Sequence, residues 1–322
     1  MVYFKAPNPR HLEKLKKIHF IGIGSNAMCD LAIALHGAGH VITGSDEEIT
    51  GLAKSKLLNN NLLPNHAGWS IETLRESPDT VIIGANIKSD NPELLRAQEL
   101  NLAVCSFPDF IYQQSIDKQR LVIAGTYSKT LIAGLIIHVL NFHKRRFDYA
   151  IGTQVVGWET QVKLSDAPLI IIEGQEVMAS VLDSTPAFLK YHHHIGVISG
   201  IEWQVSETYP TKDEYVNQFS LFGTRTPRGG ALVYLELDPV VAVLSATMGR
   251  PDVLLVPYKA HPNINEGGQE FLITSNKERL PLKIAGKHNF QNISAAQEAL
   301  KRIGITPEMF YEAVTSFGGL GN

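Results

Sequence analysis

Short apolar runs along the chain alternate with longer segments whose apolar residues recur at helical spacing. The runs are typical of buried strands, and the longer segments are typical of helices with one apolar face. Their alternation predicts an α/β fold with mainly parallel sheets, covered by helices on both faces. The predicted strands are residues 18–21, 40–43, 80–83, 102–105, 121–124, 168–173 and 195–201, and the predicted helices are residues 28–36, 131–140, 292–303 and 307–316, with another that begins near Asn91.

The length of 322 residues is suited to two domains, because an ordinary domain has roughly 100–200 residues. Two units of strand, glycine-containing turn and helix begin at Ile18 and at Leu121, so each unit can start a domain of its own. We therefore predict a first domain at residues 1–117 and a second domain at residues 118–322.

Composition and charge narrow the classes of function. The chain has 29 Lys and Arg against 32 Asp and Glu, a formal net charge of −3, whereas nucleic-acid-binding proteins usually carry an excess of basic residues. No apolar run reaches the roughly 18 residues of a membrane span. The first ten residues hold charge and proline where a signal peptide needs an apolar stretch, and Cys29 and Cys105 lie in no disulfide-like spacing. These observations predict a cytoplasmic protein whose partners include neither nucleic acid nor membrane.

The first glycine-rich turn reads Gly22-x-Gly24-x-x-Ala27, between a predicted strand and a predicted helix. Glycines let a phosphate approach the backbone, and the helix N-terminus favours its negative charge. Asp46 ends the next strand, where it either hydrogen-bonds a ribose or base or caps its own turn. The pattern predicts a phosphate-containing ligand without singling out NAD, and the alternative is a tight turn packed only for topology.

The second turn reads Gly125-Thr-Tyr-Ser128-Lys129-Thr130 and nearly matches a phosphate-binding loop. In such loops successive backbone N–H groups face the phosphates, the lysine reaches the β- and γ-phosphates, and the following hydroxyl binds Mg²⁺. Ser128 stands where the loop has a glycine. Its side chain is predicted either to collide with the phosphate or to force a φ that non-glycine residues rarely adopt.

With Gly286-Lys-His288-Asn289-Phe-Gln-Asn292, these two turns resemble the motifs of the Mur ligases of peptidoglycan synthesis. Within that family the resemblance is strongest to ligases that join UDP-N-acetylmuramate to L-alanine or to the recycled tripeptide L-alanyl-γ-D-glutamyl-meso-diaminopimelate. It implies a Rossmann-like UDP-sugar domain followed by a central P-loop-type domain that binds ATP. The family's third, acceptor-binding domain is absent from this sequence, so acceptor contacts are expected from a missing C-terminal domain or from another chain. Further motifs of the resemblance are Asn91-Pro92-Glu93, Leu182-Asp183-Ser184-x-Pro186 and Tyr209-Pro-Thr.

The family phosphorylates the muramyl carboxylate with ATP, and an amine then attacks the acyl-phosphate, while a lysine and metal ions offset the phosphate charge. By resemblance, Lys129 and Glu173 are catalytic, Thr130 and Glu173 bind Mg²⁺, and the substrate is a UDP-N-acetylmuramate-type molecule. The residues implied for the UDP-sugar are Gly22, Gly24, Ser25, Asn26, Ala27, Met28, Ser45, Asp46 and His66, and those implied for ATP are Gly125, Thr126, Ser128, Lys129, Thr130, His288, Asn289 and Asn292.

Several polar positions depart from the family pattern, although the apolar strands that carry them are intact. Tyr127 and Ser128 replace His and Gly in the nucleotide loop, and Gln175-Glu176-Val177 replaces Asp-Glu-Tyr after Glu173-Gly. Val205 replaces the histidine that binds a second metal, and valine cannot ligate a cation. We therefore predict a degenerate member with weak or no ligase activity. A divergent member that uses Glu176 or Glu202 as a ligand is the alternative.

Two other functions remain open from the sequence. One is a non-catalytic protein that binds a UDP-sugar or nucleotide and regulates cell-wall metabolism. The other is an NAD-dependent oxidoreductase, which the first glycine turn and Asp46 favour. A dehydrogenase has no use for the 125–130 loop or for the segment at His288, so no NAD is expected. His192-His193-His194 is interpreted as one packed histidine with solvent-facing neighbours, because alternate residues of an extended segment point to opposite faces.

Overall fold

The computed structural model describes residues 15–320, except residues 153–157 and 159. The chain divides into two compact units. The first holds the described residues up to Cys105 apart from Ala85–Ile87, and the second holds Ala85–Ile87 and the residues from Ser106 on. The unit division precedes the predicted domain boundary after residue 117, because helix α4 (Phe107–Gln113) packs against elements of the second unit. The first ten residues, which carried the prediction about a signal peptide, lie outside the described part.

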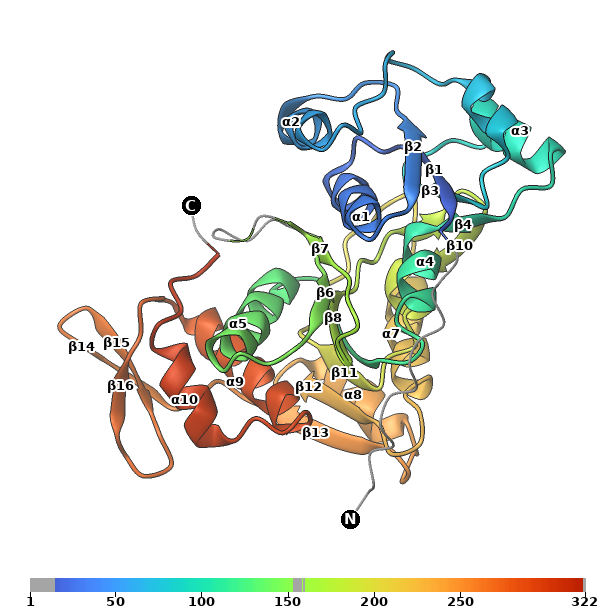
Figure 1. The fold of residues 1–322 in the computed structure, drawn as a ribbon. Helices are drawn as coiled ribbons and strands as arrows, with labels where there is room; N and C mark the ends of the chain where they lie inside the picture. Colours follow the sequence, from blue (N-terminus) through green and yellow to red (C-terminus); the bar gives the residue numbers. More distant parts are fainter. Residues whose placement is uncertain (1–14, 153–157, 159, 321–322) are drawn as a thin grey trace. The chain divides into compact units, whose positions relative to one another are not determined.

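The first unit is built on a sheet with the strand order β2-β1-β3-β4, in which β1 runs parallel to both β2 and β3 (Figure 1). The central strands of this sheet consist mainly of apolar residues, because a strand that is covered on both faces is shielded from water. Its elements are β1 (Lys17–Ile21), α1 (Asn26–Gly37), β2 (Val41–Ser45), α2 (Gly51–Asn59), the short 3₁₀ helix η1 (Ile71–Glu76), β3 (Thr80–Ile83), α3 (Pro92–Glu99) and β4 (Val104–Ser106).

The second unit contains a main sheet whose seven described strands have the order β13-β12-β11-β5-β8-β6-β7. All neighbours are parallel except β7, which runs antiparallel to β6. Its elements are α4, β5 (Gln119–Ala124), α5 (Lys129–Phe142), β6 (Asp148–Ala150), β7 (Val162–Lys163), β8 (Leu169–Glu173), β9 (Met178–Ser180), β10 (Asp183–Pro186), α6 (Ala187–Lys190), β11 (Ile195–Ile198), α7 (Lys212–Thr224), β12 (Ala231–Leu235), α8 (Pro239–Thr247), β13 (Leu254–Tyr258), β14 (Asn263–Glu266), β15 (Gln269–Ile273), β16 (Arg279–Pro281), α9 (Lys287–Lys301) and α10 (Pro307–Val314).

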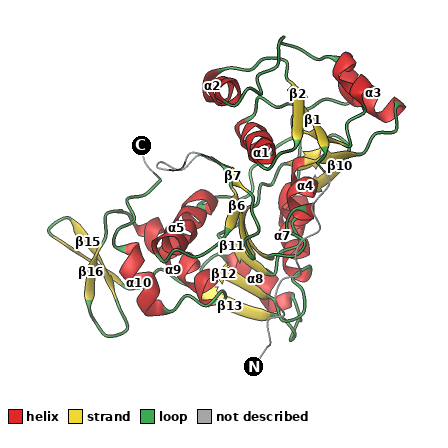
Figure 2. Cartoon of the chain, in the orientation of Figure 1, coloured by secondary structure: helices red, strands yellow, loops and turns green. Residues whose placement is uncertain are grey.

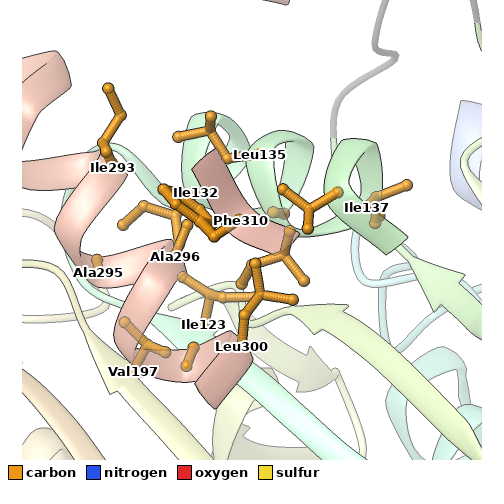
Figure 3. Close-up of a cluster of buried hydrophobic side chains, with 14 of the residues drawn as sticks. Ile123, Ile132, Leu135, Ile137, Val197, Ile293, Ala295, Ala296, Leu300 and Phe310 are labelled. Atoms are coloured by element: carbon orange, nitrogen blue, oxygen red, sulfur yellow. The ribbon is translucent and has the colours of Figure 1, made fainter. Parts of the chain in front are cut away.

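Helices cover both faces of this sheet (Figures 1 and 2). On one face α5, α9 and α10 pack over the strands, and Ile123 of β5 and Val197 of β11 meet Phe310 of α10 in a single buried cluster (Figure 3). On the other face Phe222 of α7 lies against Gly196, where a Cβ would come within 2.8 Å of the phenyl ring. Side chains along each strand therefore point alternately to the two helix layers. The predicted α/β fold with mainly parallel sheets is confirmed.

The predicted helix starts match the observed caps. The Asn91 side chain accepts hydrogen bonds from the backbone N–H groups of Glu93 and Leu94, both at 3.0 Å. Thr306 accepts from the N–H of Met309, directly before Pro307. Such caps satisfy N–H groups that lack an intrahelical partner.

Two predicted boundaries differ from the structure. The strand predicted at residues 195–201 ends at Ile198, because Gly200 adopts φ 147° and the chain turns there. The helix predicted at residues 292–303 begins earlier, at Lys287, directly after Gly286 with φ 111°. In both places a glycine in a conformation that other residues rarely adopt sets the boundary. No helix in the described ranges combines the length and apolarity that crossing a bilayer requires.

Candidate functional site

The glycine turn of the first unit folds tightly around the end of β2. The N–H groups of Gly22 and Ile23 both donate to the carbonyl of Ser45, at 2.9 and 3.0 Å, and Gly22 has φ 92°. The N–H of Gly24 donates to Oδ2 of Asp46 at 2.8 Å. These bonds hold the turn closed against β2, so its glycines serve the turn itself.

The N-terminus of α1 is the part of this turn that remains open to an anion. Ser25 precedes the helix without a side-chain cap, and no acidic residue lies in the first turn. Ser25 and Asn26 are exposed, whereas Met28 is buried and can offer a ligand only its backbone. Uncapped N–H groups and the helix dipole make this end a suitable site for a phosphate. Ala27 completes this first turn.

Asp46 and His66 lie on neighbouring loops of the first unit. The Asp46 carboxylate accepts from the N–H groups of Gly24 and Glu47, and burial raises its pKa while these hydrogen bonds oppose the rise. Gly68 donates its N–H to the carbonyl of Asp46, which brings the loop that carries the exposed His66 beside the end of β2. The Asp46 carboxylate thus meets backbone donors of two turns, and its role toward a ligand stays a prediction.

Ser45 is not open to a ligand in this arrangement. It is buried, and its hydroxyl donates to the carboxylate of Glu93, which is fully buried on α3. Glu93 also accepts from the N–H of Ser70 at 2.5 Å and lies 3.3 Å from Nε2 of His19. A buried carboxylate is stable only with such partners. Ser45 and Glu93 therefore join β2, α3 and the loop before η1 from within.

The loop between β5 and α5 has a backbone that two of its residues restrict. Gly125 has φ 129°, and a Cβ there would collide with the hydroxyl of Ser199, so only glycine fits. Ser128 has φ 66° and ψ −4° and starts α5 without a side-chain cap. The positive φ at Ser128 is one of the two consequences that the sequence predicts for a side chain at this position. A non-glycine residue in this conformation carries strain of about 1–2 kcal/mol.

Replacing Ser128 by glycine is expected to raise the free energy of unfolding of the second unit by about 1 kcal/mol, because the left-handed strain outweighs the added freedom of the unfolded chain. Guanidinium denaturation followed by circular dichroism measures the change. Ser128→Ala is the matched control, because it removes the hydroxyl and keeps the Cβ, so no gain is expected from it. An equal gain in both variants would show that the hydroxyl, rather than the backbone, carries the strain.

Lys129 is engaged within the protein. Its Nζ donates to Oε1 of Glu176 at 2.7 Å and to the carbonyl of Gly125 at 2.6 Å, and the residue is 8% exposed. A lysine that reaches phosphates must leave both partners. The ammonium group of Lys129 is therefore held within the protein, and a ligand phosphate has to compete with the carboxylate of Glu176 for it.

Glu173 ends β8 beside this loop and accepts three hydrogen bonds from the protein. Its Oε1 accepts from the hydroxyl of Thr130 at 2.8 Å and from Nε2 of Gln175 at 3.1 Å. Its Oε2 accepts from the N–H of Gly152 at 2.9 Å. The structure thus brings together Lys129, Thr130 and Glu173, as predicted, and adds Gln175 and Glu176 to them.

The remaining loop residues are fixed by the neighbouring strand end. The N–H of Thr126 donates to the carbonyl of Gly200 at 2.9 Å, and its hydroxyl lies 2.8 Å from that of Tyr215, whose pKa burial raises to about 12. Tyr127 packs over Gly200, where a Cβ would lie 2.6 Å from the phenol oxygen. Burial, with Asp238 and Glu202, raises the pKa of Tyr127, so the phenol stays protonated at neutral pH.

The residues of this site do not fit a pair of divalent cations. Mg²⁺ requires oxygen ligands in near-octahedral geometry. Both oxygens of Glu173 already accept hydrogen bonds, and the amide of Gln175 is one of the donors. Val205 is 74% exposed and offers no ligand atom. Within the described ranges, no group of three or more His, Cys, Asp or Glu side chains is placed to hold a metal ion.

The segment predicted to border adenine opens α9. His288 is exposed, and Asn289 is half-buried with its amide donating to the carbonyl of Ala285 at 2.6 Å. Asn292 is 5% exposed and belongs to the interior of the unit. The first two side chains are therefore accessible to a ligand, and the third is not.

Sequence reasoning did not assign a role to Gly152, Gln175 or Glu93. Glu93 lies in a motif that the sequence singles out, yet its buried partners come from β1, β2 and the loop before η1. Gly152 follows β6, and it meets Glu173 because β6 pairs with β8. Only the spacing of Gln175, two residues after Glu173, is a signal that could have been found in the sequence.

Two α/β units, one with a glycine turn after its first strand and one with a phosphate-type loop after β5, define an α/β protein with Rossmann-like and P-loop-type parts. A family model described as "Mur ligase family, catalytic domain" matches residues 17–118. The chain is therefore similar to the Mur ligase family over this segment.

Curated relatives with similar sequences support this similarity. The chain is 28% identical to the UDP-N-acetylmuramate–L-alanine ligase of Carboxydothermus hydrogenoformans, over 99% of this chain and 69% of that protein. It is 26% identical to the ligase of the same name from an Arthrobacter species, over 96% of this chain and 66% of that protein. The chain thus spans about two thirds of the length of these curated relatives.

Solved structures show the same fold. One is the UDP-N-acetylmuramate:L-alanyl-gamma-D-glutamyl-meso-diaminopimelate ligase from Neisseria meningitides, with a TM-score of 0.85, 21% identity, and 94% of this chain and 98% of that chain covered. Another is the UDP-N-acetylmuramate-alanine ligase from Thermotoga maritima, with a TM-score of 0.73, 21% identity, and 95% and 69% covered. The predicted resemblance to the Mur ligases is therefore confirmed.

Proposed function

We propose that this chain binds a UDP-N-acetylmuramate-type molecule through its first unit and retains a nucleotide loop in its second unit with weak or no phosphoryl transfer. The relatives named above are muramate ligases, which supports this class of substrate. One observation carries the proposal: the two residues predicted to be catalytic are hydrogen-bonded to other residues of the protein. Lys129 pairs with Glu176, and Glu173 accepts three protein hydrogen bonds.

The two candidate ligand sites differ in how much they must rearrange. At α1 the first-turn N–H groups lack a side-chain cap and the first turn has no acidic residue, so a diphosphate can approach them without breaking an ion pair. At the loop before α5 a triphosphate must displace Glu176 from Lys129, and it meets the carboxylates of Glu173 and Glu176. We therefore expect sugar-nucleotide binding to be retained more fully than ATP chemistry.

This difference also favours a second candidate function, a non-catalytic protein that binds a UDP-sugar and regulates cell-wall metabolism. An NAD-dependent oxidoreductase is disfavoured, because the Asp46 carboxylate that a ribose would need accepts from Gly24 and Glu47 instead. Domains at residues 1–117 and 118–322 remain our assignment for the UDP-sugar and ATP parts. Acceptor contacts from a further domain or another chain belong to the same proposal.

Calorimetric titration tests the proposal, with UDP-N-acetylmuramate and Mg²⁺-ATP added separately. We expect the sugar nucleotide to bind with micromolar affinity, and Lys129→Ala to leave that affinity unchanged. Any remaining ATP affinity should fall at least tenfold in Lys129→Ala, about 1.4 kcal/mol, because the ammonium is the loop's cation. Lys212→Ala, at an exposed position on α7, is the matched control and should bind both ligands as the unchanged chain does.

Turnover separates the impaired ligase from an active one. The assay measures ADP formed from Mg²⁺-ATP with and without UDP-N-acetylmuramate, in the unchanged chain and in Lys129→Ala. We expect no ADP formation that depends on both the sugar nucleotide and Lys129. Such dependent turnover would establish the ligase half-reaction and contradict the proposed loss of activity, while absence of sugar-nucleotide binding would contradict the substrate class.

A further inference from the structure

The side-chain amide of Gln175 lies against the carboxylate at the phosphate-type loop. Its Nε2 donates to Oε1 of Glu173 at 3.1 Å, and the hydroxyl of Thr130 donates to the same oxygen at 2.8 Å. A divalent cation that binds this oxygen must take the place of a hydrogen-bond donor, because an N–H group and a cation cannot share the same lone pair. The neutral amide of Gln175 thus takes a lone pair of Oε1 that a cation would need.

The space beside Gly152 is filled by the same amide. A Cβ added at Gly152 would collide with Nε2 of Gln175 and would lie 3.5 Å from the carboxyl carbon of Glu173. The N–H of Gly152 donates to the second oxygen, Oε2, at 2.9 Å. The amide of Gln175 therefore packs against the backbone at Gly152 and against Oε1 of Glu173, and it fills the space next to that oxygen.

The hydroxyl of Thr130 does not make Glu173 more available to a cation. Its hydroxyl hydrogen is directed to Glu173, and a second carboxylate, Glu176, is taken by the ammonium of Lys129 at 2.7 Å. Both oxygens of Glu173 and one oxygen of Glu176 thus have a positive or donor partner within the protein. Such satisfied groups gain little from a cation that has to be stripped of water, and Mg²⁺ loses its water reluctantly.

We propose that Gln175 is the residue that excludes a divalent cation from Glu173 and so decides the cation specificity of this loop. The inference rests on the proposed nucleotide loop, but it concerns the cation alone. Replacement of the amide by a group without an N–H donor frees Oε1 and opens the space beside Gly152. The side chain of Gln175 is half-buried. The backbone carbonyl of this residue accepts from the N–H of Phe188 at 3.0 Å, and that hydrogen bond is retained in any such variant.

Mn²⁺ without nucleotide is the probe, and its binding is measured from the loss of the free Mn²⁺ signal in electron paramagnetic resonance. We expect Gln175→Ala to bind one Mn²⁺ at least tenfold more tightly than the unchanged chain. Glu173→Gln added to Gln175→Ala should remove that gain, which assigns it to this carboxylate. Gln218→Ala, on α7, removes an amide elsewhere and is the matched control, for which no gain is expected.

Gln175→Asp provides a second variant, which restores a carboxylate and is expected to bind Mn²⁺ more tightly still. Tight Mn²⁺ binding by the unchanged chain that disappears in Glu173→Gln would overturn the proposal. So would unchanged Mn²⁺ affinity in both Gln175 variants with native circular dichroism. Because no nucleotide is present, these results do not depend on whether ATP binds, and the calorimetric titrations above test that question separately.

Discussion

Replacement of Lys118 by methionine is expected to lower the free energy of unfolding of the second unit by about 3–5 kcal/mol, the usual result of removing one partner from a buried ion pair. The side chain of Lys118 is 4% exposed and that of Asp148 is fully buried. The ammonium donates to the Asp148 carboxylate and, at 2.6 Å, to the carbonyl of Ser165. Methionine fills similar space but leaves the Asp148 charge without its cation.

Urea denaturation monitored by circular dichroism and tryptophan fluorescence measures the loss. Lys212→Met, on the exposed first turn of α7, is the matched control and should change the stability by less than about 0.5 kcal/mol. The double variant Lys118→Met with Asp148→Asn should be more stable than Lys118→Met alone, because it removes the buried charge as well. A loss below about 1 kcal/mol in Lys118→Met would mean that Ser165, which donates to Asp148 through both its N–H and its hydroxyl, is a sufficient partner.

This buried pair also supports the candidate site. Asp148 begins β6, which pairs with β8, the strand that ends at Glu173. Two residues beyond β6 the chain presents the N–H of Gly152 to Glu173. Lys118 lies directly before β5, which pairs with the other edge of β8. The ion pair therefore ties together the strands on both sides of the one that carries Glu173.

The elements of the fold and the position of the phosphate-type loop could be predicted from the sequence because their signals are local. An apolar run marks each of the predicted strands, whereas polar strands such as β10 and β14 have no such signal. Asn91 and Thr306 mark helix starts within three residues of the N–H groups that they cap. The left-handed backbone at Ser128 follows from the same local logic, since the loop geometry requires a positive φ whatever residue stands there.

The internal partners of the site residues could not be predicted, because they depend on the order of strands in the sheet. Glu173 meets Gly152 only because β8 lies between β5 and β6, an order that no local pattern encodes. Ser45 was assigned to a ligand, but it faces Glu93, which is far along the chain, and the choice between ligand and protein is made by burial. Gln175 was a departure from a motif, and its effect on Glu173 is visible only once both side chains are placed.

Acidification from pH 6.5 to pH 4 is expected to lower the free energy of unfolding of the second unit by about 3 kcal/mol through His193 alone. The sequence predicts one packed histidine among residues 192–194, and in the structure His193 is the buried one. Burial, with smaller effects from His194 and His192, lowers its pKa from 6.5 to about 3. Between these two values the unfolded chain binds a proton that the folded protein does not. Stability therefore falls as the pH falls, by up to about 1.4 kcal/mol per pH unit, and levels off near pH 3.

The structure explains why His193 stays neutral. The residue is 2% exposed, its ring centroid lies 3.9 Å from that of Phe222, and Nε2 lies 2.8 Å from the hydroxyl of Thr226. Gly196 makes room for the ring, since a Cβ there would come within 3.0 Å of it. Protonation would place a charge in this apolar layer with one hydroxyl as its only hydrogen-bond partner among the described contacts of the ring, so unfolding is favoured instead.

Urea denaturation at several pH values, in the unchanged chain and in His193→Gln, separates this effect from that of other groups. Every other titrating residue is common to the two chains, so the difference between their stabilities should narrow by about 3 kcal/mol from pH 6.5 to pH 4. His193→Gln is expected to be the less stable of the two at pH 7, because it loses contact with Phe222. Parallel pH profiles, or an NMR titration of folded His193 with a midpoint near 6.5, would show that water reaches the imidazole and that the α7 layer opens more easily than its packing indicates.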